Sequence, residues 1–378
     1  MRKKVFIVIG TRPEAIKMVP IIAQLIKNKK FFETKICITQ QHKELVNSIL
    51  KFFNINPDFK LNIMRDNQDL SYITYSILNK INPILKDNKP DYAIVHGDTS
   101  TTFATALSCF YNKIKLIHIE AGLRTYNLSS PYPEEFNRQV VGKIAYTHFS
   151  PTLLNKKNLV KEGVSSKLIF VTGNTVIDTI KMTLDKIKKN KTLKEKIEKY
   201  YYKLNINLNN KKIILITIHR RENFGKNLIS ILKAIIKITK KHPHYNLILP
   251  VHPNPNIKNI VFKYLIGFNN IYLINPLEYH YFVYLLDKSN IVISDSGGLQ
   301  EEAPFLKKPL VILRKNSERP ETITIGHSIK VGSDTKKIFA VVDRLILDKK
   351  YYNKFNKKCL IYGNGTAALQ IVKKLKKL

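Results

Sequence analysis

Cysteine is scarce in this chain, and the three cysteines that it has lie far apart. Cys37, Cys109 and Cys359 form no CxxC pair, none has a histidine at the spacing of a metal ligand, and no HExxH occurs in the 378 residues. Secreted proteins that depend on disulfides carry many cysteines at regular spacings. The sequence therefore predicts no disulfide, no metal site and a reducing cytoplasmic location.

Long apolar runs are also missing. The apolar runs Val5–Ile9, Ala93–Val95, Ile213–Ile216 and Ile291–Ile293 are short, and polar or turn residues bound each of them. A membrane-spanning helix needs about 20 predominantly apolar residues. The basic start Met1–Lys4 leads into the first of these short runs, which is not the pattern of a signal peptide. We expect no association with a membrane.

Acidic residues are few. The chain has 28 Asp and Glu against 64 Lys and Arg, a formal net charge of +36. Such a charge can indicate binding to nucleic acid or to a membrane surface. The basic residues are scattered, however, and no stretch interleaves basic with aromatic residues as a single-strand binding platform does. We attribute the charge to a lysine-rich composition, and nucleic-acid binding remains the less favoured alternative.

Two common nucleotide motifs are absent as well. No GxGxxG follows the first predicted strand, and the chain has no GxxxxGK[ST]. These motifs accompany dinucleotide cofactors and Mg-bound triphosphates. Neither NAD nor a nucleoside triphosphate is therefore expected.

Strand and helix patterns alternate along the chain, which is typical of parallel sheets built from βαβ units. The length suits two domains, and the alternation breaks between Gly173 and Lys211. The sequence predicts an α/β protein with two doubly wound Rossmann-like domains, residues 1–173 and 174–365, facing a cleft. Residues 366–378 have one apolar helical face and are expected to pack back on the first domain. The predicted strands are Lys4–Ile9, Thr34–Thr39, Asp91–His96, Lys115–Ile119, Thr147–Ser150, Leu168–Val171, Ile213–Ile218, Tyr245–Pro250, Ile271–Ile274, Ile291–Ser294 and Pro309–Leu313.

The strongest local signal is Ser296-Gly297-Gly298. A predicted strand runs into this segment, and a helix follows it with Ser296 as the expected cap. Glycines let backbone N–H groups approach a ligand closely, and a helix start favours anions. Glu302, one turn further on, can reach ribose hydroxyls. We expect a nucleotide diphosphate here, and the alternative is a glycine turn without a ligand.

The first strand of each half also leads into polar residues. Arg12 follows the first strand, where its guanidinium suits a phosphate, and Lys17 lies about one helical turn further on. The alternative is two surface cations. His219 follows the first strand of the second half and can exchange a proton near neutral pH. The alternative there is a loop histidine paired with Glu222.

Three acids are expected on one rim of the first sheet. Asp98 and Glu120 each follow a predicted strand, and Glu134 follows Pro133. Ligands in open α/β sheets bind beyond the carboxyl ends of the strands, so the three acids predict a catalytic cluster. Each has a structural alternative. Asp98 could cap the next helix, Glu120 could pair with Arg124, and Glu134 could complement a helix dipole.

Taken together, these segments resemble the non-hydrolysing bacterial UDP-N-acetylglucosamine 2-epimerase family. The resemblance runs in order over essentially the whole chain. It is carried by Gly10–Lys17, His96–Thr99, Glu120–Thr125, Pro133–Glu135, Asn137-Arg138, Gly173–Thr175, His219–Glu222, Asp295–Glu302 and Glu318–Glu321.

The resemblance implies a glycosyltransferase-B fold, a homodimer, and interconversion of UDP-GlcNAc and UDP-ManNAc without added cofactor. Phe282 would lie beside the uracil, or else serve as a core aromatic, and Leu277 stands where related sequences often carry glutamine. A second UDP-GlcNAc site of the family includes the region of Gln41-His42. The implied binding residues are Arg12, Lys17, Asp98, Glu120, His219, Phe282, Ser296, Gly297, Gly298, Glu302 and Arg319.

Elimination is the route that fits these residues, because inverting C2 by oxidation would need a nicotinamide. Our hypothesis is that Asp98, Glu120 and Glu134 handle the C2 proton while His219 supports the leaving phosphate. The product would supply cell-surface polysaccharide synthesis. The alternatives are a hydrolysing epimerase that releases ManNAc and UDP, a glycosyltransferase of the same fold, and a basic nucleic-acid-binding protein.

Overall fold

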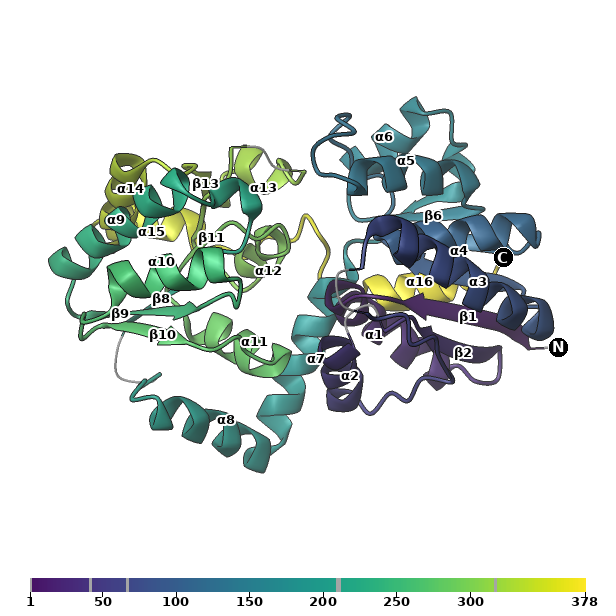
Figure 1. Cartoon of the computed structure of the whole chain (residues 1–378), viewed down its shortest axis with the longest axis horizontal. Helices are drawn as coiled ribbons and strands as arrows, with labels where there is room; N and C mark the ends of the chain where they lie inside the picture. Colours follow the sequence, from purple (N-terminus) through teal and green to yellow (C-terminus); the bar gives the residue numbers. More distant parts are fainter. Residues whose placement is uncertain (1, 41–42, 66–67, 209–211, 316–317) are drawn as a thin grey trace. The chain divides into compact units, whose positions relative to one another are not determined.

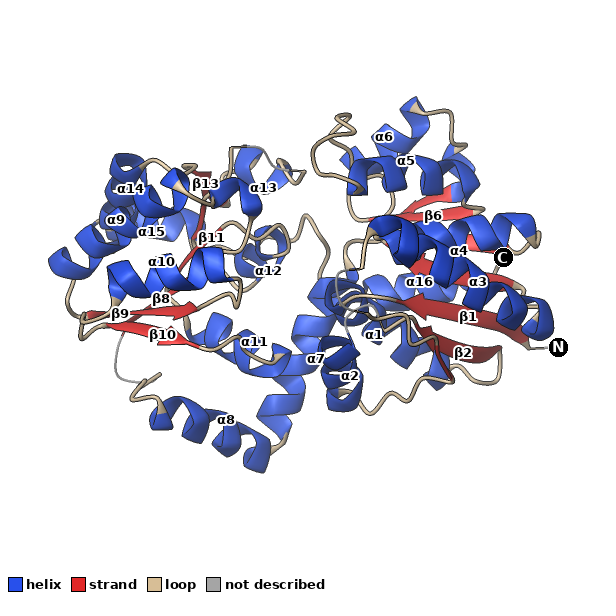
Figure 2. Cartoon of the chain, in the orientation of Figure 1, coloured by secondary structure: helices blue, strands red, loops and turns tan. Residues whose placement is uncertain are grey.

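The chain forms two compact α/β units (Figure 1). The computed structural model describes residues 2–40, 43–65, 68–208, 212–315 and 318–378. The first unit is Met1–Thr179 with Tyr362–Leu378, and the second is Ile180–Ile361. Each unit has a parallel sheet with helices between its strands, as the colours of Figure 2 show. The prediction of an α/β protein with two doubly wound sheets is confirmed.

The sheet of the first unit has the strand order β3-β2-β1-β4-β5-β6-β7. The chain moves from β1 toward β2 on one side and later returns to add β4 on the other. This reversal creates a topological switch point between β1 and β4, where such sheets bind ligands. The strands are β1 (Lys3–Ile9), β2 (Phe32–Ile38), β3 (Phe59–Lys60), β4 (Tyr92–His96), β5 (Lys115–Ile119), β6 (Thr147–Ser150) and β7 (Ile169–Val171). The helices among them are α1 (Arg12–Lys27), α2 (Lys43–Phe52), α3 (Leu70–Asn88), α4 (Ser100–Tyr111), α5 (Glu134–Ile144) and α6 (Leu153–Lys161).

The sheet of the second unit has the strand order β10-β9-β8-β11-β12-β13. The strand order reverses here too, and the switch point lies between β8 and β11. The strands are β8 (Lys212–Thr217), β9 (Tyr245–Pro250), β10 (Ile271–Ile274), β11 (Ile291–Ser294), β12 (Leu310–Ile312) and β13 (Ser328–Lys330). The helices from the connecting helix onward are α7 (Thr175–Lys189), α8 (Lys191–Lys203), α9 (Lys226–Lys241), α10 (Pro255–Leu265), α11 (Tyr279–Lys288), α12 (Leu299–Phe305), α13 (Glu321–Thr324), α14 (Thr335–Leu347) and α15 (Lys349–Phe355).

The central strands are buried because helices cover both faces of each sheet. Val5–Ile9 in β1 and Ile213–Ile216 in β8 are at most 1% exposed. Strands of this kind read as continuous apolar runs rather than as an alternation. Each such side chain stabilises its unit by roughly 1.5–3 kcal/mol when fully buried. The short apolar runs of the sequence are therefore the centres of the two sheets.

The last helix, α16 (Ala367–Leu375), packs against α1 in the first unit (Figure 1). Its apolar face, which includes Ile371 and Leu375, is buried. Asp178 accepts hydrogen bonds from the backbone N–H groups of Ala367 and Ala368, at 3.2 and 2.9 Å. Burial on one side and capping at its start therefore anchor this helix.

All three cysteines are buried free thiols. Among the described residues, no helix combines the length and the apolar character that crossing a bilayer requires.

Candidate active site

The predicted site residues follow the carboxyl ends of the strands in each unit. In the first unit Arg12 opens α1, Asp98 and Glu120 follow the neighbouring strands β4 and β5, and Glu134 opens α5. In the second unit His219 follows β8, and Ser296 follows β11. Arg12 and Asp98 follow the two strands that flank the switch point of the first sheet, and His219 and Ser296 follow those of the second, where ligands of open α/β folds bind.

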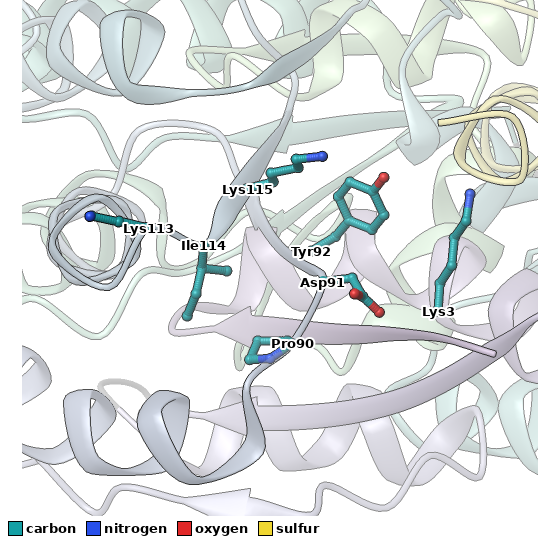
Figure 3. Close-up of a pocket in the computed structure, with 7 residues that line it drawn as sticks. All are labelled: Lys3, Pro90, Asp91, Tyr92, Lys113, Ile114 and Lys115. Atoms are coloured by element: carbon teal, nitrogen blue, oxygen red, sulfur yellow. The ribbon is translucent and has the colours of Figure 1, made fainter. Parts of the chain in front are cut away.

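A hollow of about 260 Å³ lies at the opposite ends of the strands in the first unit (Figure 3). Its lining includes Lys3, Tyr92 and Lys115, the first residues of β1, β4 and β5. Parallel sheets bind ligands at the carboxyl ends of their strands rather than at these amino ends. The hollow is therefore separate from the candidate active site.

Glu120 is held by groups from three different segments. Its Oε2 contacts Lys17 Nζ and accepts a hydrogen bond from Asn174 Nδ2, and His96 Nε2 lies 3.8 Å away. Its backbone has a φ of 62°, a left-handed conformation that non-glycine residues rarely adopt. Backbone strain of this kind persists where the surroundings fix it, and it is common at functional sites.

The alternative role for Glu120, a pairing with Arg124, is wrong. Arg124 instead grips Glu162 with two parallel contacts, Nε to Oε1 and Nη2 to Oε2, both 2.7 Å. The Glu120 carboxylate is therefore left to Lys17 and its other neighbours at the strand end.

Asp98 is fixed through both its side chain and its backbone. Arg138 Nε donates to Asp98 Oδ2 at 2.7 Å, and Asn137 Nδ2 donates to the Asp98 carbonyl at 2.8 Å. The alternative role as helix cap is wrong, because Thr99 caps α4 and accepts a hydrogen bond from Thr102 N at 3.1 Å. The Asp98 carboxylate is 21% exposed and paired with a cation at the strand end.

The two acids at the start of α5 differ in their surroundings. Glu135 is fully buried and accepts hydrogen bonds from the backbone N–H groups of Thr125 and Tyr126 at 2.9 and 3.0 Å. Glu135 thus holds the loop that precedes it. Glu134 as a whole residue is only half-buried, although its Oε2 atom is buried.

Glu14 belongs to this site but was not predicted there. Its carboxylate accepts hydrogen bonds from Gly10 N and Thr11 N at 3.1 and 2.6 Å, and from Thr99 Oγ1 at 2.9 Å. Burial raises the pKa of Glu14 to about 7. The residue joins the loop before Arg12 to the loop after β4. The sequence signal was the position of Glu14 three residues after the helix cap Thr11, the spacing of a capping box.

Two buried histidines lie in the strands β5 and β6. His118 in β5 lies beside His148 in β6, and its Nε2 is 2.7 Å from the Gly97 carbonyl oxygen. Burial lowers the pKa of His118 to about 4 and that of His148 to about 3. Both rings are therefore neutral near pH 7, and His118 helps to hold the turn that leads to Asp98.

In the second unit, Asp295 orients His219. The fully buried Asp295 carboxylate accepts hydrogen bonds from the backbone N–H groups of His219 and Arg220, at 3.0 and 2.9 Å. It also lies 3.1 Å from His219 Nδ1. Burial lowers the pKa of His219, while Asp295 opposes that shift. With Nδ1 facing Asp295, the Nε2 of His219 is the ring nitrogen left for a ligand.

The predicted alternative of a His219–Glu222 pair is wrong. Glu222 Oε1 accepts instead from Arg314 Nε at 3.0 Å. Asp295 was not predicted as a site residue, because its partner His219 lies 76 residues away in the chain.

Three guanidinium groups converge on Gly297. A Cβ at this position would lie 3.0 Å from Arg319 Nη1, 3.4 Å from Arg220 Nη2 and 3.8 Å from Arg314 Nη1. The missing side chain leaves room for these cations beside the backbone, and guanidinium groups bind phosphate well. Arg319 was predicted here, and Arg220 and Arg314 were not. Their convergence makes this turn a candidate anion site.

The helix after this turn is capped by Gly298 rather than by the predicted Ser296. Because α12 begins at Leu299, Ser296 precedes the cap, and its backbone N–H donates to Ser294 Oγ at 2.8 Å. Glu302 lies in the first turn of α12 and is buried.

Phe282 is half-buried in α11 and packs on the core cluster that includes Leu277. This position suits either role that the sequence left open for Phe282. Gln41 and His42 lie outside the described residues.

The chain is similar in sequence to a named family over nearly all its length. Residues 24–376 match the family model described as UDP-N-acetylglucosamine 2-epimerase. The UDP-N-acetylglucosamine 2-epimerase of Campylobacter jejuni is 46% identical over 375 residues, which cover 98% of this chain and 97% of that protein.

Solved structures agree with this match. The UDP-GlcNAc 2-epimerase from Neisseria meningitidis bound to UDP-GlcNAc matches with a TM-score of 0.94 at 46% identity, covering 99% of this chain and 100% of that one. The Methanocaldococcus jannaschii UDP-GlcNAc 2-epimerase in complex with UDP-GlcNAc and UDP gives 0.86 at 33% identity, covering 99% and 100%. The Rossmann-like units of the glycosyltransferase-B type are thereby confirmed. The chain belongs to the UDP-N-acetylglucosamine 2-epimerase family.

Proposed function

We propose that this protein interconverts UDP-GlcNAc and UDP-ManNAc by inverting C2 of the sugar, without hydrolysis and without an added cofactor. The observation that carries the proposal is the pair Asp98 and Glu120, which follow neighbouring strands and are each tied to a cation. The relatives named above as UDP-GlcNAc 2-epimerases support the choice of substrate.

The proposed reaction is an elimination followed by re-addition. A base removes the C2 proton, the C2–H electron pair forms a C1=C2 double bond, and the C1–O bond breaks with its electrons on UDP. The product is 2-acetamidoglucal with UDP. In the return step a phosphate oxygen of UDP attacks C1, and C2 takes a proton on its other face. No oxidant or reductant is needed.

The acids of the first unit are the proposed proton-transfer groups. Inversion requires one group that removes a proton from one face of C2 and another that delivers a proton to the opposite face. Asp98, Glu120 and Glu134 are the candidates. Asp98 and Glu120 are positioned by Arg138 and Lys17, while Glu134 stays half-buried at the start of its helix.

The second unit is proposed to bind UDP. Ser296, Gly297 and Gly298 with Arg319 would bind the diphosphate, and His219 would support the leaving phosphate oxygen. Asp295 favours that role, because it faces His219 Nδ1 and leaves Nε2 for the phosphate. Arg12 of the first unit would add a further contact to the phosphates, and Lys17 to the substrate. Glu302 would bind the ribose, and Phe282 would lie beside the uracil.

We also propose where the enzyme acts, how it assembles and what its product supplies. The family resemblance supports a cytoplasmic homodimer that supplies cell-surface polysaccharide synthesis. A hydrolysing epimerase would share the elimination step but would release free ManNAc and UDP. A glycosyltransferase would need an acceptor and would leave UDP-GlcNAc unchanged without one.

The test follows the C2 proton in three variants. Asp98→Asn, Glu120→Gln and Glu134→Gln each keep the side-chain size but remove the charge. We expect the exchange of the C2 proton with solvent deuterium to fall about 10²–10⁴-fold in the variants that remove a proton-transfer group. Undiminished exchange in all three would refute the assignment. UDP binding, measured in parallel, separates loss of chemistry from loss of folding.

A further inference from the structure

Asn174 is a buried polar residue with no role in the mechanism proposed above. It is 2% exposed and lies in the segment between β7 and α7. Its side-chain amide makes two contacts of different kinds. Nδ2 donates to Glu120 Oε2, and Oδ1 accepts from Val176 N at 3.1 Å. The two neighbours fix the orientation of the amide, since a carboxylate accepts only from the NH₂ group and an N–H donates only to the oxygen.

The backbone of Asn174 is fixed as well. Its N–H donates to the Tyr362 carbonyl at 2.8 Å. Gly173 leaves no room for a side chain on that side, because a Cβ there would lie 2.7 Å from the same carbonyl oxygen. The chain leaves the first unit after Thr179 and returns to it at Tyr362. Asn174 thus contacts Glu120, the start of α7 and the returning chain at once.

We propose that Asn174 is a positioning residue for Glu120, holding the carboxylate through a hydrogen bond while its oxygen caps α7. The inference rests on the proposed function, in which Glu120 transfers the C2 proton. The charged and titratable groups near this carboxylate include Lys17 from α1, His96 from β4 and His118 from β5. Lys17 Nζ is at the end of a flexible side chain, whereas the side-chain amide of Asn174 is fixed by its hydrogen bond from Val176 N and its backbone by the bond to the Tyr362 carbonyl. Asn174 therefore sets the direction of the Glu120 carboxylate as well as adding a contact.

The structure offers a substitution that separates this role from helix capping. Asn174→Asp keeps an oxygen for Val176 N, and aspartate caps helices as well as asparagine does. The same change places a second carboxylate against Glu120 in place of a donor. Asn174→Ser also keeps a capping oxygen, adds no charge and is too short to reach Glu120. Asn190→Asp is the matched control, because Asn190 caps the exposed start of α8 through Leu193 N at 2.9 Å.

The experiment measures C2 deuterium exchange, the pH profile of kcat/KM and the shift in melting temperature caused by UDP. We expect exchange to fall at least tenfold in Asn174→Asp and Asn174→Ser, with the UDP-induced shift unchanged. In Asn174→Asp the acidic limb of the profile should also move about one pH unit upward, because a like charge disfavours ionisation. A merely structural role would not move that limb.

The possible results separate a failure of this inference from a failure of the proposed function. If both Asn174 variants match Asn190→Asp in exchange and pH profile, the inference is overturned. If the wild type itself shows no C2 exchange, the proposed function fails instead. Should Asn174→Asp not fold, the exchange rate of Asn174→Ser decides the inference.

Discussion

Burial raises the pKa of Glu14 to about 7, although Gly10 N, Thr11 N and Thr99 Oγ1 all donate to its carboxylate. In the unfolded chain the same group ionises near its ordinary value of 4.5. Between those pH values the folded state keeps a proton that the unfolded state loses, so this residue makes the protein less stable as pH rises.

The substitution Glu14→Gln should remove this pH dependence. From pH 4.5 to 7, the wild type is expected to lose on the order of 3 kcal/mol of unfolding free energy relative to the variant. Urea unfolding at several pH values measures the difference. Glu44→Gln, at the exposed first turn of α2, is the control and should keep the slope of the wild type. Parallel pH curves for wild type and Glu14→Gln would show that Glu14 titrates normally.

Strands with apolar runs were predictable from the sequence, even the three-residue strands β7 and β12, whereas short strands without such a run were not. Val5–Ile9 and Ile213–Ile216 mark β1 and β8 because strands buried on both faces need continuous apolar residues. The strand β3, Phe59–Lys60, has two residues, and β13, Ser328–Lys330, has three. Strands this short show no periodicity, and neighbouring strands define them instead.

Some residues of the site could likewise be predicted from the sequence, and others could not. Asp98, Glu120 and His219 were predictable, because polar residues after a buried strand lie at the rim of a parallel sheet. Arg314 and Asp295 were not, since each acts through a partner that only the fold brings near. Arg314, for example, contacts Glu222, which lies 92 residues away in the chain. The misplaced cap Ser296 has a local cause, because α12 starts two residues later than the pattern indicates.

The turn between β11 and α12 gives a prediction at the scale of the element. A methyl group in Gly297→Ala would lie 3.0 Å from Arg319 Nη1 and would displace the guanidinium groups around it. We expect UDP affinity, measured by calorimetry, to fall about tenfold, which corresponds to about 1.4 kcal/mol.

Gly298→Ala is the matched comparison for this turn. Its Cβ would meet only ordinary contacts, with Glu302 Oε1 at 3.7 Å. The loss of affinity should therefore be smaller than for Gly297→Ala. Equal affinities in the two variants would contradict a role for the convergence of arginines.

Helix α16 gives a second prediction at this scale. Ile371 is fully buried in the face of α16 that packs in the first unit, whereas Leu369 is 52% exposed. Ile371→Ala should destabilise the protein by about 2–5 kcal/mol, and Leu369→Ala by no more than about 0.5 kcal/mol. Denaturant unfolding measures both. Similar losses in the two variants would mean that α16 does not depend on its buried face.

At the scale of the whole molecule, the net charge of +36 is the property that most invites another function. Our interpretation assigns recognition to UDP rather than to nucleic acid. UDP at about 100 times its Kd should therefore stabilise the protein by about 2.7 kcal/mol, visible as a higher melting temperature. Duplex DNA should be retained only at low salt, since non-specific phosphate contacts weaken steeply as salt rises. Retention at physiological salt without protection by UDP would favour the nucleic-acid alternative.

The central proposal at this scale is that the whole protein inverts C2 of UDP-GlcNAc without hydrolysis. The most direct measurement is NMR of the purified protein with UDP-GlcNAc in deuterated buffer. We expect UDP-ManNAc to accumulate to equilibrium with UDP-GlcNAc, and deuterium to enter C2 of both sugars. Release of free ManNAc and UDP would indicate hydrolysis, and an unchanged UDP-GlcNAc signal with no deuterium at C2 would contradict the proposed function altogether.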